Sequence, residues 1–275
     1  QLSPENAKLH YLSCEIHPVL VKDLQRFYRQ LPSTFNPIAE KLLEIYPEQG
    51  KGIHRLKFQF QTRHITLDLL YGNAVDAFKN LSIPPDGGMD AWYLDGHAPS
   101  KNEEIWNISL CKTIASLSKP VQTTLASYSV AGTIRRNLEE AGFTLSKTDG
   151  YGKKRHMLTG HLENVDKHAG NTALSWRNPW SIESPENTSI AIIGAGLAGC
   201  ASAYAIANRG YRVTLIEKNE IIANSASGNA RGIVHVSPAR QNTPASLFRL
   251  NAFNYAIRHY QILAEINDFS WSSCG

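Results

Sequence analysis

The chain has 275 residues, of which 42% are hydrophobic and 19% are charged, and its formal net charge is +4. This composition is ordinary for a globular protein and excludes a disordered or fibrous chain. No apolar run approaches the length of a membrane span, so we expect no membrane partner. The first residues have neither the basic nor the apolar segment of a signal peptide, and we expect a cytoplasmic protein.

The cysteines give no sign of a metal site. They are Cys14, Cys111, Cys200 and Cys274, and no pair has Cys-x-x-Cys spacing. We therefore predict no metal and no redox motif, with the thiols reduced. The mild positive charge permits a polyanionic partner without requiring one.

The first half of the chain alternates expected strands and helices. We expect strands at 8–15, 53–60, 65–71, 89–94, 123–127, 143–147 and 156–160, and helices at 18–30, 74–81, 106–117 and 130–141. The strand at 89–94 is expected to be buried. The order predicts an α/β fold and is similar to a class I methyltransferase sheet from its second strand onward.

The alternation stops between about residues 163 and 187, where Asn, Ser and Pro indicate a linker. A second unit begins near residue 188. We therefore expect three parts, at 1–162, 163–187 and 188–275.

Residues 188–218, TSIAIIGAGLAGCASAYAIANRGYRVTLIEK, are the most informative stretch. A strand that we expect to be buried precedes Gly194-x-Gly196-x-x-Gly199, and a helix and a second strand ending at Glu217 follow. The first glycine makes the turn, the second admits a pyrophosphate and the third lets the helix pack closely. Glu217 is placed for ribose hydroxyls, and an acid there disfavours NADP. The motif does not choose between NAD and FAD, and another glycine-rich turn is the alternative.

Three polar residues stand at the ends of expected strands or directly after them. Glu15 stands where an acid takes the ribose hydroxyls of a nucleotide, or is a solvated charge. Asn73 could bond an adenine edge or cap the next helix. Asp95 emerges at the carboxyl edge of the sheet, where a carboxylate can accept the proton of an amine that attacks a methyl group. The alternative for Asp95 is an Asx turn with Gly96.

The most basic region suits a nucleic acid. Tyr residues interleave with positive side chains there, which fits a phosphate backbone with a base stacked nearby. A solvated charged surface is the alternative. The candidate contacts are Arg135, Arg136, Lys153, Lys154 and Arg155.

A loop of small residues, 225–232 (SASGNARG), follows the second strand of the second unit. Its N–H groups could bind a pyrophosphate or lie near a flavin ring, and a plain flexible loop is the alternative. The residues that matter are Ser227, Gly228 and Asn229.

Four segments in this order carry a resemblance to a known family. They are residues 90–106 (DAWYLDGHAPSKNEEIW), residues 133–158 (TIRRNLEEAGFTLSKTDGYGKKRHML), the glycine motif and residues 225–232. Together they resemble the bifunctional tRNA 5-methylaminomethyl-2-thiouridine biosynthesis family. That family fuses an S-adenosylmethionine-dependent methyltransferase to an FAD-dependent oxidoreductase of the glycine/D-amino-acid oxidase type, and the match covers nearly the whole chain.

The resemblance implies two reactions on the wobble uridine of tRNA. FAD oxidises the carboxymethylamino side chain, and hydrolysis leaves a primary amine and glyoxylate; S-adenosylmethionine then methylates that amine. It implies that Asp95 is the base for methyl transfer and that Glu15 binds the adenosyl ribose. It assigns Gly194, Gly196, Gly199 and Glu217 to FAD, with Ser227, Gly228 and Asn229 on the flavin side. The basic residues become tRNA contacts.

The chain also departs from the family pattern. Asn73 stands where the family often has Asp beside the adenine. Residues 1–14 contain no glycine, although the family's glycine-rich loop should lie there, and 58 residues follow Glu217. We therefore expect an internal fragment with neither active site complete. The other readings are an amine oxidase fused to a methyltransferase with a non-tRNA substrate, a non-catalytic nucleotide- or RNA-binding fragment, and an NAD-linked dehydrogenase.

Overall fold

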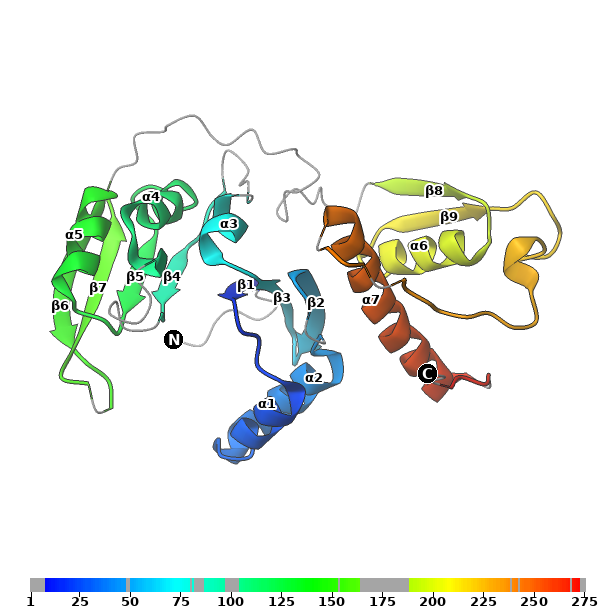
Figure 1. The fold of residues 1–275 in the computed structure, drawn as a ribbon, viewed down its shortest axis with the longest axis horizontal. Helices are drawn as coiled ribbons and strands as arrows, with labels where there is room; N and C mark the ends of the chain where they lie inside the picture. Colours follow the sequence, from blue (N-terminus) through cyan, green and yellow to red (C-terminus); the bar gives the residue numbers. More distant parts are fainter. Residues whose placement is uncertain are drawn as a thin grey trace.

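The strands within the described residues form three separate sheets (Figure 1). The structure, a computed structural model, describes residues 8–47, 50–79, 81, 87–96, 104–152, 154–163, 188–237, 239–241, 243–267 and 269–272. The predicted α/β class is confirmed. The linker predicted at 163–187 lies almost wholly outside the described residues.

The first sheet has three strands in the order β1-β3-β2. Strands β1 (Lys8–Glu15) and β3 (Arg63–Tyr71) are parallel, and β2 (Gly52–Phe60) pairs antiparallel with β3. Helices α1 (Val21–Tyr28) and α2 (Asn36–Ile45) connect β1 to β2. Leu56, Leu69 and Tyr71 form a small core that packs against Leu42 and Ile45 of α2, so α2 covers one face of this sheet.

A buried ion cluster joins all three strands of the first sheet. Asp68 on β3 is 1% exposed and accepts hydrogen bonds from Arg55 Nε and Nη2, both at 2.7 Å. His10 Nε2 of β1 lies 2.7 Å from the second oxygen of the same carboxylate. Burial raises the pKa of the Asp68 carboxyl, but the hydrogen bonds from Arg55 and His10 outweigh it and hold the pKa below its usual value.

The second sheet has four strands in the order β4-β5-β7-β6. Strands β4 (Ala91–Leu94) and β5 (Thr124–Ser127) are parallel, whereas β6 (Phe143–Asp149) and β7 (His156–Leu162) are antiparallel to each other. The helices of this part are α3 (Ala74–Lys79), α4 (Ile108–Ser116) and α5 (Gly132–Glu140). The expected single methyltransferase sheet is therefore divided into two sheets, and no ladder joins β1 to β4 among the described residues.

One hydrophobic core nevertheless serves both sheets. Its buried members include Leu70 of β3, Phe78 of α3, Trp92 of β4 and Ile134 of α5, and Leu12 and Cys14 of β1 pack against it. Trp92 also donates its indole N–H to Ser118 Oγ at 2.8 Å. The two sheets are thus parts of one packed unit.

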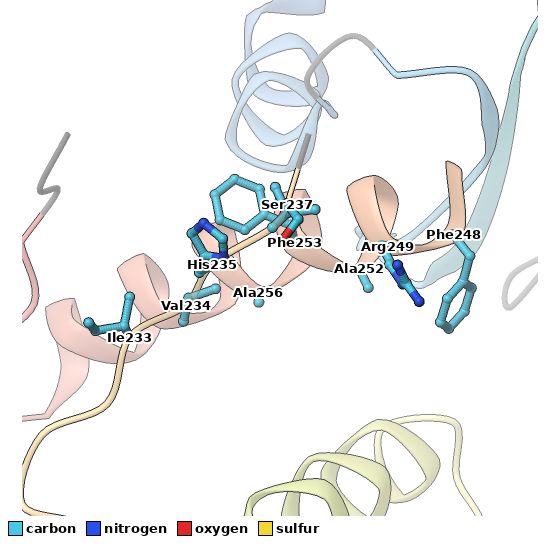
Figure 2. A pocket seen from close by; sticks show the side chains of 10 residues that line it. Ile233, Val234, His235, Ser237, Phe248, Arg249, Ala252, Phe253 and Ala256 are labelled. Carbon is cyan, nitrogen blue, oxygen red and sulfur yellow. The ribbon is translucent and has the colours of Figure 1, made fainter. Parts of the chain in front are cut away.

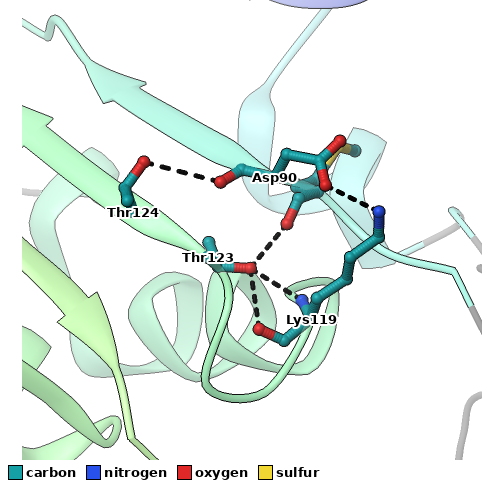
Figure 3. Close-up of polar contacts among 5 residues, drawn as sticks. Asp90, Lys119, Thr123 and Thr124 are labelled. Carbon is teal, nitrogen blue, oxygen red and sulfur yellow. Dashed lines mark hydrogen bonds and ion pairs between the residues drawn. The ribbon is translucent and has the colours of Figure 1, made fainter.

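Polar contacts fix the amino ends of β4 and β5 (Figure 3). Thr123 is fully buried, and its hydroxyl accepts from the N–H of Lys119 at 2.7 Å. The same hydroxyl lies within hydrogen-bonding distance of the Met89 and Lys119 carbonyls and donates to one of them. Lys119 Nζ reaches Asp90 at 2.6 Å. These contacts tie the turn after α4 to β4, at the opposite end of the strands from Asp95.

The third sheet begins the second unit. Strands β8 (Ser189–Ile193) and β9 (Arg212–Ile216) pair in parallel, and α6 (Leu197–Ala207) connects them. A long helix, α7 (Pro244–Ile266), follows. Figure 1 shows α7 lying between this unit and the first sheet. Asn251 Nδ2 donates to the Lys51 carbonyl at 3.1 Å, and Arg258 Nη1 donates to the Ile45 carbonyl at 3.3 Å.

The structure corrects two predictions of burial. Strand β8 alternates between exposed and half-buried residues, and Ile193 is 88% exposed. The reason is that only α6 packs on the two strands in the described part of residues 188–272, where Ala195 alone is fully buried. Strand β4 was also expected to be buried, but only Trp92 is, and Tyr93 is 71% exposed.

The remaining predictions differ mostly at boundaries. The strand predicted at 8–15 is confirmed to the residue, and those predicted at 143–147 and 156–160 are both longer. The helix predicted at 18–30 begins only at Val21, because Leu20 has extended backbone angles. Helices α2 and α7 were not predicted at all.

Candidate functional site

Two predicted ligands lie at one edge of the first sheet. Glu15 and Tyr71 are opposite each other at the ends of β1 and β3, and the Gly72 N–H donates to the Glu15 carbonyl at 3.0 Å. The Glu15 carboxylate is exposed and accepts from the N–H of His17 at 2.8 Å. Asn73 Oδ1 accepts from the N–H of Val75 at 2.8 Å, so this side chain caps α3. Glu15 is therefore open to a ligand, whereas the Asn73 oxygen already has a partner.

Asp95 follows β4 at the carboxyl edge of the second sheet, and it is exposed. Its N–H donates to the Tyr93 carbonyl at 3.1 Å, which makes a tight turn. Ser127 at the end of β5 donates its hydroxyl to the Leu94 carbonyl at 3.0 Å. A parallel pair of strands thus presents Asp95 where ligands of α/β sheets bind. No described hydrogen bond links Asp95 to Glu15, which belongs to the other sheet.

The hairpin between β6 and β7 carries part of the predicted basic region. Lys154 and Arg155 are exposed, as is Tyr151 at 93%. Lys153 lies outside the described residues. The N–H of Lys154 donates to the Tyr151 carbonyl at 3.2 Å, so the turn is closed by its own backbone. The hairpin therefore presents positive charge and an aromatic ring to solvent.

The two arginines of α5 differ in their contacts. Arg135 Nε donates to Glu139 at 2.8 Å, one turn along the same helix. Arg136 Nη2 lies 3.5 Å from Thr133 Oγ1. The charge of Arg135 is thus partly neutralised within α5, and Arg136 and Lys154 are the stronger candidates for a phosphate.

The glycine motif forms the turn from β8 into α6. Gly194 has φ +95°, a value that L side chains rarely adopt, and its N–H donates to the Ile216 carbonyl at 2.7 Å. A Cβ atom at Gly199 would overlap the Gly194 carbonyl oxygen, so only glycine permits this close approach of helix and strand. Gly196 is the N-cap residue of α6. The roles expected for Gly194 in the turn and Gly199 in the packing agree with the local geometry, and the pyrophosphate role of Gly196 stays a prediction.

Glu217 lies directly after β9 and contacts the glycine turn. Its Oε2 accepts from the N–H of Ala195 at 2.8 Å, and its Oε1 accepts from the N–H of Asn219 at 3.1 Å. These backbone donors, Ala195 first, hold the pKa of the Glu217 carboxyl below its usual value of 4.5. The carboxylate is therefore ionised at neutral pH and lies beside the glycine turn.

The loop at 225–232 folds back onto the start of α6. Ser227 Oγ accepts from the N–H of Leu197 at 3.1 Å, and a Cβ atom at Gly196 would lie 2.9 Å from the same oxygen. A phosphate oxygen can take the place of this hydroxyl, because a helix N-terminus favours negative charge. Gly228 closes the turn by donating its N–H to the Ser225 carbonyl at 2.8 Å, and Asn229 follows it. The predicted FAD residues are thus brought together.

A cavity of about 530 Å³ lies between the extended segment 233–237 and α7 (Figure 2). Its walls are mainly apolar, with His235, Ser237 and Arg249 as the polar exceptions. It contains none of the predicted ligands. Sequence reasoning missed it because α7 was not predicted, although Thr243, Pro244 and Ser246 carry the signal of a capped helix start.

Two absences apply to the described part of the chain. No helix there is long and apolar enough to cross a membrane. No group of His, Cys, Asp and Glu side chains there could hold a metal ion.

Family models match both halves of the chain. Residues 33–163 match an S-adenosyl-L-methionine-dependent methyltransferase family, and residues 189–275 match a family of FAD-dependent oxidoreductases. The cofactors expected from the resemblance, S-adenosylmethionine and FAD, are thereby confirmed at the level of the families, and the NAD-linked alternative is disfavoured.

Individual relatives match along nearly the whole chain. One is the tRNA 5-methylaminomethyl-2-thiouridine biosynthesis bifunctional protein MnmC of Marinomonas sp. (strain MWYL1), 36% identical over 98% of this chain and 39% of that protein. The protein of the same name from Pseudoalteromonas translucida (strain TAC 125) is 37% identical over 100% of this chain and 40% of that protein. The chain thus spans about two fifths of the length of these curated relatives.

A solved structure, MNMC2 from Aquifex aeolicus, aligns with 21% identity and a TM-score of 0.40, over 59% of this chain and 47% of that one.

Proposed function

We propose that the chain is part of a bifunctional tRNA 5-methylaminomethyl-2-thiouridine biosynthesis protein, to which the two family models and the relatives are similar, and that the polypeptide that carries it modifies the wobble uridine of tRNA in two steps. The first step oxidises the carbon beside the secondary amine of a 5-carboxymethylaminomethyl group, and water then releases glyoxylate and leaves a primary amine. The second step transfers a methyl group to that amine. We place the units at 1–162 and 188–275, joined by 163–187, in a cytoplasmic protein.

The observation that carries the oxidative half is the contact between Glu217 and the glycine turn. Gly194, Gly196 and Gly199 shape a turn that a pyrophosphate can approach, and Glu217 stands beside it for the ribose. The Ser227 hydroxyl oxygen lies at the N-terminus of α6 and accepts a backbone hydrogen bond there. An oxygen atom of a ligand would therefore fit the same place. Bound FAD would supply the two-electron acceptor. The glycine turn and Glu217 would hold its adenosine diphosphate, and Gly228 and Asn229 would lie on the flavin side.

The position of Asp95 supports the methyl-transfer half. It is exposed on a tight turn at the carboxyl edge of β4, where an amine can approach its carboxylate. By accepting a proton from the amine, Asp95 leaves the nitrogen lone pair free to attack the methyl group. Glu15 lies exposed at the end of β1, where it can take the ribose hydroxyls of S-adenosylmethionine. Asn73 caps α3 and could offer its amide to the adenine.

Three features support tRNA as the substrate. Both relatives bear names that refer to tRNA. The hairpin after β6 exposes Lys154, Arg155 and Tyr151, which together suit a phosphate and a stacked base. The formal net charge is positive. Arg136 on α5 adds a further cation, and Lys153 and Arg135 complete the proposed set.

The test uses the polypeptide encoded by the complete open reading frame that contains these residues. Under anaerobic conditions it is mixed with a tRNA that bears 5-carboxymethylaminomethyl-2-thiouridine. We expect the flavin absorbance to bleach and glyoxylate to appear in equal amount. Bleaching by small secondary amines such as sarcosine but not by tRNA would support the non-tRNA alternative instead. Absence of bleaching with either substrate would favour the non-catalytic alternative.

A further inference from the structure

A tyrosine behind the Asp95 turn has no role in the function proposed above. Tyr128 directly follows β5, and its hydroxyl donates to the carbonyl oxygen of Gly96. Its neighbour Ser127 donates to the Leu94 carbonyl at 3.0 Å. The carbonyl groups of the residues before and after Asp95 therefore each accept a hydrogen bond from a hydroxyl group at the end of β5.

The same tyrosine contacts the basic hairpin on its ring face. Lys154 Nζ lies 5.0 Å from the centroid of the Tyr128 ring, a cation–π arrangement. Lys154 is exposed, and its ammonium group has three donors, so it can bind a phosphate while it remains over the ring. One aromatic side chain thus links the hairpin to the turn that carries Asp95.

Packing restricts the turn on its other side. A Cβ atom at Gly96 would lie 2.9 Å from Cζ2 of Trp106, which is itself 5% exposed. The Gly96 backbone therefore rests against a buried ring while the Tyr128 hydroxyl holds its carbonyl. The turn has little freedom to shift as long as both contacts persist.

We propose that Tyr128 is a positioning residue, which sets the distance between an RNA phosphate bound at Lys154 and the carboxylate of Asp95. The proposal rests on the proposed tRNA substrate. The ring supports Lys154, and the hydroxyl holds the turn. Removing the hydroxyl alone should therefore make the Asp95 turn more mobile without weakening RNA binding. Removing the Lys154 charge should weaken RNA binding without making the Asp95 turn more mobile.

The test compares Tyr128→Phe and Lys154→Met in the polypeptide of the complete reading frame. For Tyr128→Phe we expect the amide of Asp95 to exchange hydrogen about tenfold faster and kcat for methyl transfer to fall by about tenfold, in line with the loss of one hydrogen bond. KM for tRNA and the affinity for an anticodon stem-loop RNA should be unchanged. For Lys154→Met we expect weaker RNA binding, with a salt slope smaller by about 1, and no change in hydrogen exchange at the Asp95 amide.

Tyr255→Phe on α7 is the matched control, since Tyr255 is exposed and remote in sequence from the turn; it should change neither readout. An Asp95 amide and a kcat that do not respond to Tyr128→Phe would overturn this inference alone. Failure of the unaltered protein to bind tRNA would overturn the proposed function and this inference with it. A fall in kcat for Tyr128→Leu but not for Tyr128→Phe would assign the effect to the ring and contradict the role of the hydroxyl.

Discussion

The Glu217 carboxylate accepts a hydrogen bond from the N–H of Ala195 at 2.8 Å, across the parallel ends of β8 and β9. This contact joins the acid that ends the second strand to the middle of the glycine turn. Ala195 is fully buried although its unit has little core, so the turn is the best-packed point of the described part of that unit. The acid that we propose to bind a ribose therefore also orders the turn that we propose to bind a pyrophosphate.

This contact should depend on pH at the acid end of the scale. The pKa of Glu217 is lowered first by the Ala195 N–H, so the contact is present above the lowered pKa and is lost as the pH falls through it. We expect the amide resonance of Ala195 to titrate with a midpoint below 4.5, the usual value for this carboxyl. The Glu217→Gln variant should show no such transition. A midpoint at or above 4.5 would show that the contact does not form in solution.

Gly199→Ala should damage the turn, because the added Cβ atom would overlap the Gly194 carbonyl oxygen. Overpacking of this kind typically costs about 1–3 kcal/mol. We expect faster amide hydrogen exchange throughout β8 and β9. Gly232→Ala is the control, since a Cβ atom there meets nothing within 4 Å. Equal exchange rates in the two variants would contradict the close packing of α6 on β8.

The ion cluster of the first sheet predicts a large effect of Asp68→Asn. Removing the charge leaves Arg55 without the carboxylate that accepts two of its hydrogen bonds. Breaking a buried pair typically costs about 3 kcal/mol of the free energy of unfolding. Because the pKa of Asp68 is lowered, its contribution is present at neutral pH and is lost as the pH falls through the folded-state pKa.

Urea denaturation followed by circular dichroism measures this loss. Glu140→Gln is the control, because its pair with Lys112 is exposed on both sides, and such pairs are worth less than about 1 kcal/mol. A similar small loss for both variants would mean that the Asp68 cluster adds nothing beyond a surface pair.

The sequence alone predicted the elements whose local signal is strong. The glycine motif and its flanking strands specify one backbone path, because only glycine fits Gly194 and Gly199. Strand β1 was bounded correctly, and it ends at the acid Glu15 as predicted. These are features that a few neighbouring residues determine.

The rest depends on tertiary contacts that no local pattern contains. The burial of β8 could not be judged, because it depends on which elements cover the sheet. In the sequence Asp68 is one polar residue within a predicted strand. Its ion-pair partners are brought to it only by the pairing of β1 and β2 with β3. The contact between Tyr128 and Lys154 likewise depends on how the hairpin after β6 folds beside β5, which no local pattern predicts. Helix α2 did carry a signal, Pro37 in its first turn, that was overlooked.

The central claim is that one polypeptide carries two separate sites that act in sequence, and an Asp95→Asn variant tests it most directly. The polypeptide of the complete reading frame is incubated with FAD, S-adenosylmethionine and tRNA that bears 5-carboxymethylaminomethyl-2-thiouridine, and the nucleosides are separated by mass spectrometry. The unaltered protein should yield the methylaminomethyl nucleoside. Asp95→Asn should accumulate the aminomethyl nucleoside, with methyl transfer slowed by at least about a hundredfold. Methylated product formed at the unaltered rate would contradict the account.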